Sequence, residues 1–167
     1  MTELTQQRLK ELLSYDHETG LFTWRVSKGT AKKGSIAGYK HLDGYIQIMI
    51  DNKNYLAHRL AWIYVYGSLP EKDLDHINEI KDNNRICNLR LATRQENNHN
   101  ISKPRIHNIS GFRGVCWCKC AKKWKSQIGI NGKKKYLGIF NTAEEAYEAY
   151  LKAKREIHPF WVEDKVA

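Results

Sequence analysis

The sequence contains no long hydrophobic run. Among its 167 residues, no apolar stretch approaches the roughly 20 residues that a membrane-spanning helix needs. The first 13 residues, MTELTQQRLKELL, are mixed in charge and lack the apolar core of a secretory signal peptide. Both absences argue against a membrane or secreted protein, so we expect a cytoplasmic one.

Cysteine is also scarce, with four residues in the chain. In a cytoplasmic setting these are expected to be thiols rather than disulfides. Cys116, Cys118 and Cys120 alternate along the chain and would share one face of a strand. This spacing differs from the Cys-x-x-Cys pairs of zinc ribbons, which favours plain thiols over a structural zinc site.

Acidic residues are missing from one long segment. From Lys103 to Tyr136 there are ten basic residues and no Asp or Glu, whereas the rest of the chain balances 18 basic against 18 acidic residues. The whole formal net charge of +10 therefore comes from this segment. It indicates a polyanionic partner, with nucleic acid favoured over a membrane surface. A merely solvated charged face is the alternative, which the interleaved Trp and Tyr residues weaken.

Hydrophobic periodicity predicts an α+β chain. In its first part, helices are expected over 3–14, over 58–66 and from 94, and strands over 21–26, 44–50, 55–56, 74–78 and 89–91. Gly67 is expected to end the second helix. Thr93 and Glu96 have the Ser/Thr-x-x-Glu spacing of a capping box, which places Asn97 in the first turn of the third helix.

The last third of the chain predicts a unit of its own. Strands are expected over 111–117, 124–130 and 135–140, followed by a helix over 142–158. Asn131-Gly132 is a strong hairpin signal between the second and third strands, and Thr142 with Glu145 gives a second capping box. Three strands with a packed helix are the minimum for an independently stable sheet.

A carboxylate, an imidazole and two amides lie along residues 74–100. Asp75 and His76 close a short apolar run, Asn88 follows twelve residues after His76, and Asn97 belongs to the helix. Phosphodiester hydrolysis needs an activated water and charge neutralisation on the phosphate. A neutral His can act as the general base, and oxygen ligands such as Asp and Asn can hold a hard divalent cation. Turn formers, caps and a strand-end histidine are the alternative, which explains each residue alone but not the combination.

The same region resembles the HNH endonucleases, in the form found in phage and intron-borne homing enzymes. The resemblance covers about residues 55–100. The matching motifs, in chain order, are His58-Arg59-Leu60-Ala61, Asp75-His76-Ile77-Asn78, Asp82-Asn83-Asn84-Arg85, Asn88-Leu89-Arg90 and Thr93-Arg94-Gln95-Glu96-Asn97. The resemblance implies a ββα-metal (HNH) finger.

The resemblance also implies roles for particular residues. His76 would be the general base, Asp75 and Asn97 metal ligands, and Asn88 would orient His76 by a hydrogen bond to its other ring nitrogen. Asn97 stands where many relatives have His, which favours Mg²⁺ or Mn²⁺ over zinc. In the preceding helix, His58 is expected to be structural or to contact phosphate rather than to catalyse.

Residues 110–161 resemble the plant Apetala/ethylene-response-factor DNA-binding domain. The matching segments are Phe112-Arg113-Gly114-Val115, Lys123-Trp124, Tyr136-Leu137-Gly138-Ile139-Phe140 and Asn141-Thr142-Ala143-Glu144-Glu145-Ala146. The resemblance implies a small three-stranded antiparallel sheet, braced by a helix, that lies in the DNA major groove. Cys116, Cys118 and Gly129 replace basic contacts of the plant domains, so the plant target sequence does not carry over. The expected DNA contacts are Arg113, Trp117, Lys119, Lys122, Lys123, Lys125, Lys134 and Tyr136, with Arg59 in the nuclease part.

These features together predict a metal-dependent, homing-type HNH endonuclease that binds double-stranded DNA. We expect it to nick as a monomer without an obligate protein partner, in the host cytoplasm if a phage encodes it. The alternatives are a non-catalytic DNA-binding regulator with a scaffold HNH unit, and an RNA-binding or ribosome-associated protein. The expected organisation is an N-terminal extension (1–54), an HNH unit (55–102), a linker (103–109), an Apetala-like domain (110–161) and a tail (162–167).

Overall fold

The computed structural model describes residues 4–27, 29–104, 106–158 and 160–161, so the expected tail at 162–167 lies outside the described residues. The chain divides into two compact units, one ending at Asn97 and the other running from Asn98 to Glu163. The first unit combines helices with small antiparallel sheets, and the second packs a helix on one antiparallel sheet, which confirms the α+β prediction. No helix in the described part of the chain is long and apolar enough to cross a membrane.

The first unit begins with a helix and a hairpin. Helix α1 (Gln6–Leu12) leads into strand β1 (Leu13–Tyr15), which pairs antiparallel with β2 (Phe22–Trp24). The predicted helix therefore ends two residues early, because Leu13 and Tyr15 enter the core from a strand. These side chains belong to a cluster of thirteen buried residues that also receives side chains from β4 and α2.

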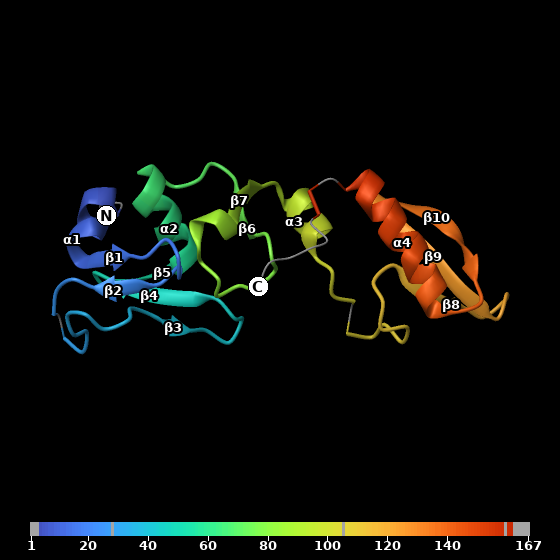
Figure 1. Ribbon diagram of the computed structural model, residues 1–167, viewed down its shortest axis with the longest axis horizontal. Helices are drawn as coiled ribbons and strands as arrows, with labels where there is room; N and C mark the ends of the chain where they lie inside the picture. The colour runs from blue at the N-terminus through green and yellow to red at the C-terminus, as the bar shows by residue number, and fades with distance from the viewer. Residues whose placement is uncertain (1–3, 28, 105, 159, 162–167) are drawn as a thin grey trace. The chain divides into compact units, whose positions relative to one another are not determined.

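A second sheet and a helix complete this part (Figure 1). Strands β3 (Tyr39–Lys40), β4 (Ile46–Ile50) and β5 (Lys53–Leu56) form an antiparallel sheet in that order. Helix α2 (Ala57–Tyr66) follows directly and ends as predicted at Gly67, whose φ of 88° is left-handed. Leu60, Ala61 and Ile63 of α2 are buried in the same core cluster.

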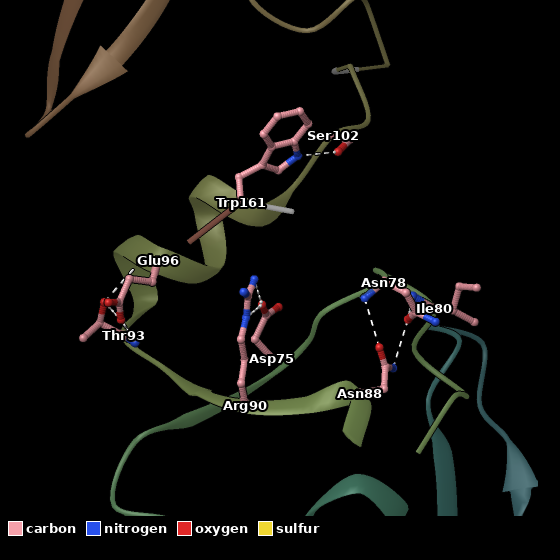
Figure 2. A network of polar contacts seen from close by, with 9 residues as sticks. All are labelled: Asp75, Asn78, Ile80, Asn88, Arg90, Thr93, Glu96, Ser102 and Trp161. Atoms are coloured by element: carbon pink, nitrogen blue, oxygen red, sulfur yellow. Dashed lines mark hydrogen bonds and ion pairs between the residues drawn. The ribbon is translucent and has the colours of Figure 1, made fainter. Parts of the chain in front are cut away.

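The end of the first unit has the order strand, loop, strand, helix. Strand β6 (Asp73–His76) pairs antiparallel with β7 (Leu89–Ala92), and a 3₁₀ turn (Ile86–Asn88) precedes β7. The predicted strand to residue 78 stops at His76, because a turn bonded from the Glu79 amide to the His76 carbonyl follows it. Helix α3 (Arg94–Asn100) opens with the predicted capping box, in which the Thr93 and Glu96 side chains each accept the other's backbone N–H (Figure 2).

The second unit is a three-stranded sheet with one helix. Strands β8 (Val115–Cys118), β9 (Lys123–Ile130) and β10 (Lys133–Phe140) are antiparallel with β9 in the centre, and helix α4 (Ala143–Ile157) lies across them (Figure 1). Asn131 and Gly132 both have positive φ, as the predicted two-residue hairpin requires. The capping box of Thr142 and Glu145 is present. Two small buried clusters hold α4 on the sheet.

Candidate active site and nucleic-acid interface

Asp75 and His76 lie at the end of β6, and the register of β6 with β7 sets the partner of Asp75. Arg90 stands directly opposite Asp75 and donates from Nε and Nη2 to Oδ2, at 3.0 and 2.9 Å (Figure 2). The Asp75 and Arg90 side chains are only 12% and 19% exposed. Sequence reasoning gave Arg90 no role. Two opposite charges on neighbouring strands suggest an ion pair, but the strand register must be known before they can be placed opposite each other.

His76 is buried, with 5% of its surface exposed. Its ring packs edge-on against His58, at 5.0 Å between centroids, and lies 5.9 Å from the ring of Tyr45. Its Nε2 is 3.4 Å from Oδ1 of Asn84. Burial lowers the pKa of His76, and the contact with Asn84 opposes this effect in part. The imidazole is therefore neutral near pH 7, which is the form that a general base needs.

The Asn88 side chain braces the loop rather than His76. Its Nδ2 donates to Asn78 Oδ1 at 3.0 Å, and its Oδ1 accepts the Asn78 backbone N–H at 3.1 Å (Figure 2). Its Nδ2 also donates to the Asn83 carbonyl at 2.8 Å. These contacts use both polar groups of the amide, so the predicted hydrogen bond from Asn88 to His76 is wrong. The amide that meets His76 is that of Asn84, which sequence reasoning placed in a motif without giving it a role.

Asn97 lies in the first turns of α3, where the capping box was predicted to place it. Its Oδ1 is buried and has no hydrogen-bond partner in the described part of the chain. A buried unpaired oxygen costs about 1–3 kcal/mol, a cost that a bound cation would remove. The oxygens of Asn97 and Asp75 are chemically suited to a hard ion such as Mg²⁺ or Mn²⁺. The described residues contain no group of three or more His, Cys, Asp or Glu placed to hold a metal.

His58 and Arg59 are neighbours on α2 with opposite environments. His58 is 6% exposed, and burial, with a smaller effect from His76, lowers its pKa to about 3. The neutral ring of His58 packs against His76 and Tyr45. This environment fits a structural role better than a phosphate contact. Arg59 is exposed.

The register of the second unit sorts the expected DNA contacts by face. Residues paired across an antiparallel sheet point to the same side. Trp124 packs against the core under α4. Trp117 stands opposite Trp124 in the sheet, with 5.0 Å between their ring centroids, so Trp117 lies on the helix side of the sheet. The expected DNA contacts that lie on the outer face are Lys123, Lys125, Lys134 and Tyr136.

The remaining expected contacts lie outside the strands. Lys119 and Lys122 occupy the turn between β8 and β9. Arg113 precedes β8, and its guanidinium donates to the Asn98 carbonyl at 3.1 Å. Cys116 and Cys118 share the outer face with Lys125 and Lys123, and all four cysteines are free thiols.

Comparison with known proteins separates the two parts of the chain. Residues 55–99, which include all four proposed site residues, match the HNH endonuclease family. The chain is also 30% identical over 102 residues to Protein 3.8 of Escherichia phage T7, an alignment that covers 60% of this chain and 83% of that protein. The chain belongs to the HNH endonuclease family.

This HNH endonuclease-family chain carries a second recognisable domain. Residues 110–158 match the AP2 domain. The matches confirm both resemblances, and the two domains together indicate DNA binding. The chain is also similar to a solved structure of the HNH homing endonuclease I-HmuI, described for DNA binding and cleavage, with 22% identity and a TM-score of 0.42 over 82% of this chain and 76% of that one.

Proposed function

We propose that this HNH-family protein is a metal-dependent, homing-type endonuclease that hydrolyses phosphodiester bonds of duplex DNA. One observation carries the proposal. A buried, neutral His76 follows directly after Asp75 at the end of β6, within the segment that matches HNH endonucleases. Asn97, with its unpartnered buried oxygen, lies in the same matched segment.

His76 would act as the general base. Because Nε2 faces the side-chain oxygen Oδ1 of Asn84, the ring proton belongs on Nε2 and the lone pair on Nδ1. Nδ1 would take a proton from water as the water oxygen attacks phosphorus. The bond from phosphorus to the 3′ oxygen then breaks, and the leaving oxygen takes a proton from solvent water, which gives a 5′ phosphate and a 3′ hydroxyl. General-base help of this kind contributes about 10²- to 10⁴-fold in rate.

Asp75 and Asn97 would hold the divalent cation, Mg²⁺ or Mn²⁺. When bound, the cation supplies charge neutralisation at the phosphate and the leaving oxygen. Arg90 holds the Asp75 carboxylate by one oxygen and fixes its direction. Asn88 would contribute indirectly, by keeping the loop between β6 and β7 closed.

The second unit would hold the DNA. Its outward lysines suit phosphate contacts, which give affinity without much sequence information. One active site in one chain cuts one strand, so we expect a monomer that nicks. No obligate protein partner is needed for this reaction.

Plasmid cleavage tests the proposal. Purified protein with Mg²⁺ or Mn²⁺ should convert supercoiled plasmid to the open circular form, and EDTA should abolish the reaction. Direct conversion to linear plasmid at limiting protein would contradict nicking by a monomer. Absence of cleavage with either metal, together with tight duplex binding, would support the non-catalytic regulator. Stronger binding of RNA than of duplex DNA at equal salt would support the RNA-binding alternative.

A further inference from the structure

The loop between β6 and β7 is supported from outside by residues that precede the HNH match. Tyr15, on β1, donates its hydroxyl to the Asn84 carbonyl at 2.7 Å. Both residues are buried, with 6% and 2% of their surfaces exposed. The two are 69 positions apart in sequence. Because an unpaired buried hydroxyl or carbonyl is costly, this bond ties the N-terminal hairpin to the loop.

Gly20, in the turn between β1 and β2, packs against the same point. Its φ is +73°, and a Cβ there would lie 2.5 Å from the Arg85 nitrogen and 2.7 Å from the Asn84 carbonyl carbon. These are backbone atoms, which cannot move aside as the end of a flexible side chain can. The hairpin therefore fits directly onto the backbone that carries Asn84.

Further contacts from the same extension follow the loop towards β6. Lys40 forms an ion pair with Asp82 at 2.6 Å, and Lys81 donates to the Asp43 carbonyl at 2.8 Å. Both contacts are exposed and contribute little free energy by themselves. They also join the N-terminal extension to the loop, but they stabilise it less than the buried hydrogen bond of Tyr15 does.

The Asn84 side chain connects the supported loop to the imidazole of His76. Its Nδ2 donates to the Asp82 carbonyl at 3.1 Å, and this contact fixes which way the amide points. Oδ1 is then the atom that faces His76 Nε2, at 3.4 Å. An oxygen can only accept here, so the contact favours the tautomer with the proton on Nε2.

We propose that Asn84, held by Tyr15 of the N-terminal extension, is a positioning residue that sets the tautomer and direction of His76. The active centre then includes residues outside the matched HNH segment, and the extension is part of the catalytic unit. This inference rests on the proposed nuclease function for its kinetic consequence, but not for its effect on the tautomer.

Four variants test the proposal. Asn84→Ala removes the acceptor, Asn84→Asp keeps an acceptor oxygen, and Tyr15→Phe frees the loop backbone. Tyr64→Phe is the matched control. Its ring lies 5.7 Å from that of Tyr15, and its hydroxyl has no hydrogen-bond partner among the described residues. Each purified variant is examined by thermal unfolding, by nicking kinetics and by ¹⁵N NMR of the His76 imidazole.

We expect Asn84→Ala to lower kcat about 10-fold or more while KM for DNA stays within about twofold, because ring orientation acts on the chemical step. Asn84→Asp keeps an acceptor beside Nε2 but loses the donor to the Asp82 carbonyl, so it should restore only part of that loss. Tyr15→Phe should lower kcat several-fold, whereas Tyr64→Phe should leave it unchanged. An Asn84→Ala protein that is folded and keeps the kcat of the unmodified protein would overturn the proposal. Loss of kcat only in proportion to the loss of folded protein would overturn it as well.

The NMR measurement separates this proposal from the nuclease proposal. At a pH where His76 is neutral, the unmodified protein should show the Nε2–H tautomer, and Asn84→Ala a mixture or the other tautomer. If the unmodified protein cuts no DNA, the nuclease proposal fails while a tautomer change still supports the role of Asn84. If the tautomer is the same in both proteins, the role of Asn84 fails whatever the cleavage result.

Discussion

The polar side chains of the candidate site in the first unit and those of the outer sheet face in the second unit differ in how far they are buried. In the first unit His76, Asn78, Asn84 and Asn88 are between 2% and 7% exposed and are bonded into one loop. In the second unit Lys123, Lys125 and Lys134 lie on the outer face of the sheet, beside a Tyr136 that is 59% exposed. Bond cleavage needs groups fixed in a site of low dielectric constant, whereas phosphate contact needs charges that reach solvent.

Charge and core size follow the same division. The basic segment from residue 103 to 136 lies within the second unit, whereas the rest of the chain is neutral. Among the residues that the structure describes, the first unit has a cluster of thirteen buried residues, and the second has two clusters of three. A large core can hold a precise polar site, while a small one suffices to present a charged sheet.

Among the variants that keep His76, the largest effect is expected at Asn97. Asn97→Ala should lower the nicking rate by about 100-fold or more, because it removes a proposed metal ligand, and leave duplex affinity without metal within about twofold. The folded protein should lose no stability, since Oδ1 makes no hydrogen bond among the described residues. Asn98→Ala, which changes the exposed neighbour, is the control for single-turnover kinetics. Equal losses in both variants would remove Asn97 from the metal site.

The next effect concerns the lysines of the outer face. Changing Lys123, Lys125 and Lys134 together to Ala should weaken duplex binding. The slope of log K against log salt should become shallower by about 0.9 for each phosphate that the variant no longer neutralises. The single-turnover rate at saturating protein should not change. A control variant replaces three exposed lysines of the first unit, Lys32, Lys33 and Lys53. If the control weakens binding as much, the division of labour between the units is wrong.

A smaller effect is expected from pH. His58 has a folded pKa of about 3, below the ordinary value of 6.5. Between these two values the unfolded chain binds a proton at His58 and the folded chain does not. Stability from this group is complete above pH 6.5 and falls as the pH drops towards 3. Between pH 7.5 and pH 5 the loss amounts to about 2 kcal/mol. Denaturant unfolding of His58→Phe beside the unmodified protein measures it. Equal pH dependence in the two proteins would show that His58 does not titrate in this way.

The smallest effect is expected at the cap of α4. Thr142→Ala removes the side chain that accepts the Glu145 amide and should cost about 1 kcal/mol of stability in the second unit. Thr142→Ser keeps a hydroxyl and should cost much less. Equilibrium denaturation of the two variants gives the comparison. No difference between them would mean that the capping box does not stabilise this unit.

Local signals in the sequence predicted much of this structure. Both capping boxes, the Asn131-Gly132 hairpin and the end of α2 at Gly67 depend on neighbours along the chain, and all are present. The strand that begins at Leu13 was missed, because Leu13 continues the helical spacing of α1 and only the pairing with β2 shows that a strand begins there.

The contacts of the candidate site were harder to predict, because they are made at a distance. Asp75, His76, Asn88 and Asn97 were chosen from spacing and resemblance. The pairing of Asp75 with Arg90 needed the strand register, and the contact of His76 with Asn84 needed the path of the loop. Asn88 was assigned to the wrong partner for the same reason. Tyr15 lies 69 residues from Asn84, beyond any local pattern.

We propose that the first unit cuts DNA through His76 while the second unit holds it. The direct test compares His76→Ala with the unmodified protein at saturating concentration on one duplex, in Mg²⁺, and measures both the single-turnover nicking rate and the dissociation constant. We predict a rate about 10²- to 10⁴-fold lower, with a dissociation constant within about twofold. An unchanged rate, with no contaminating nuclease, would contradict the claim.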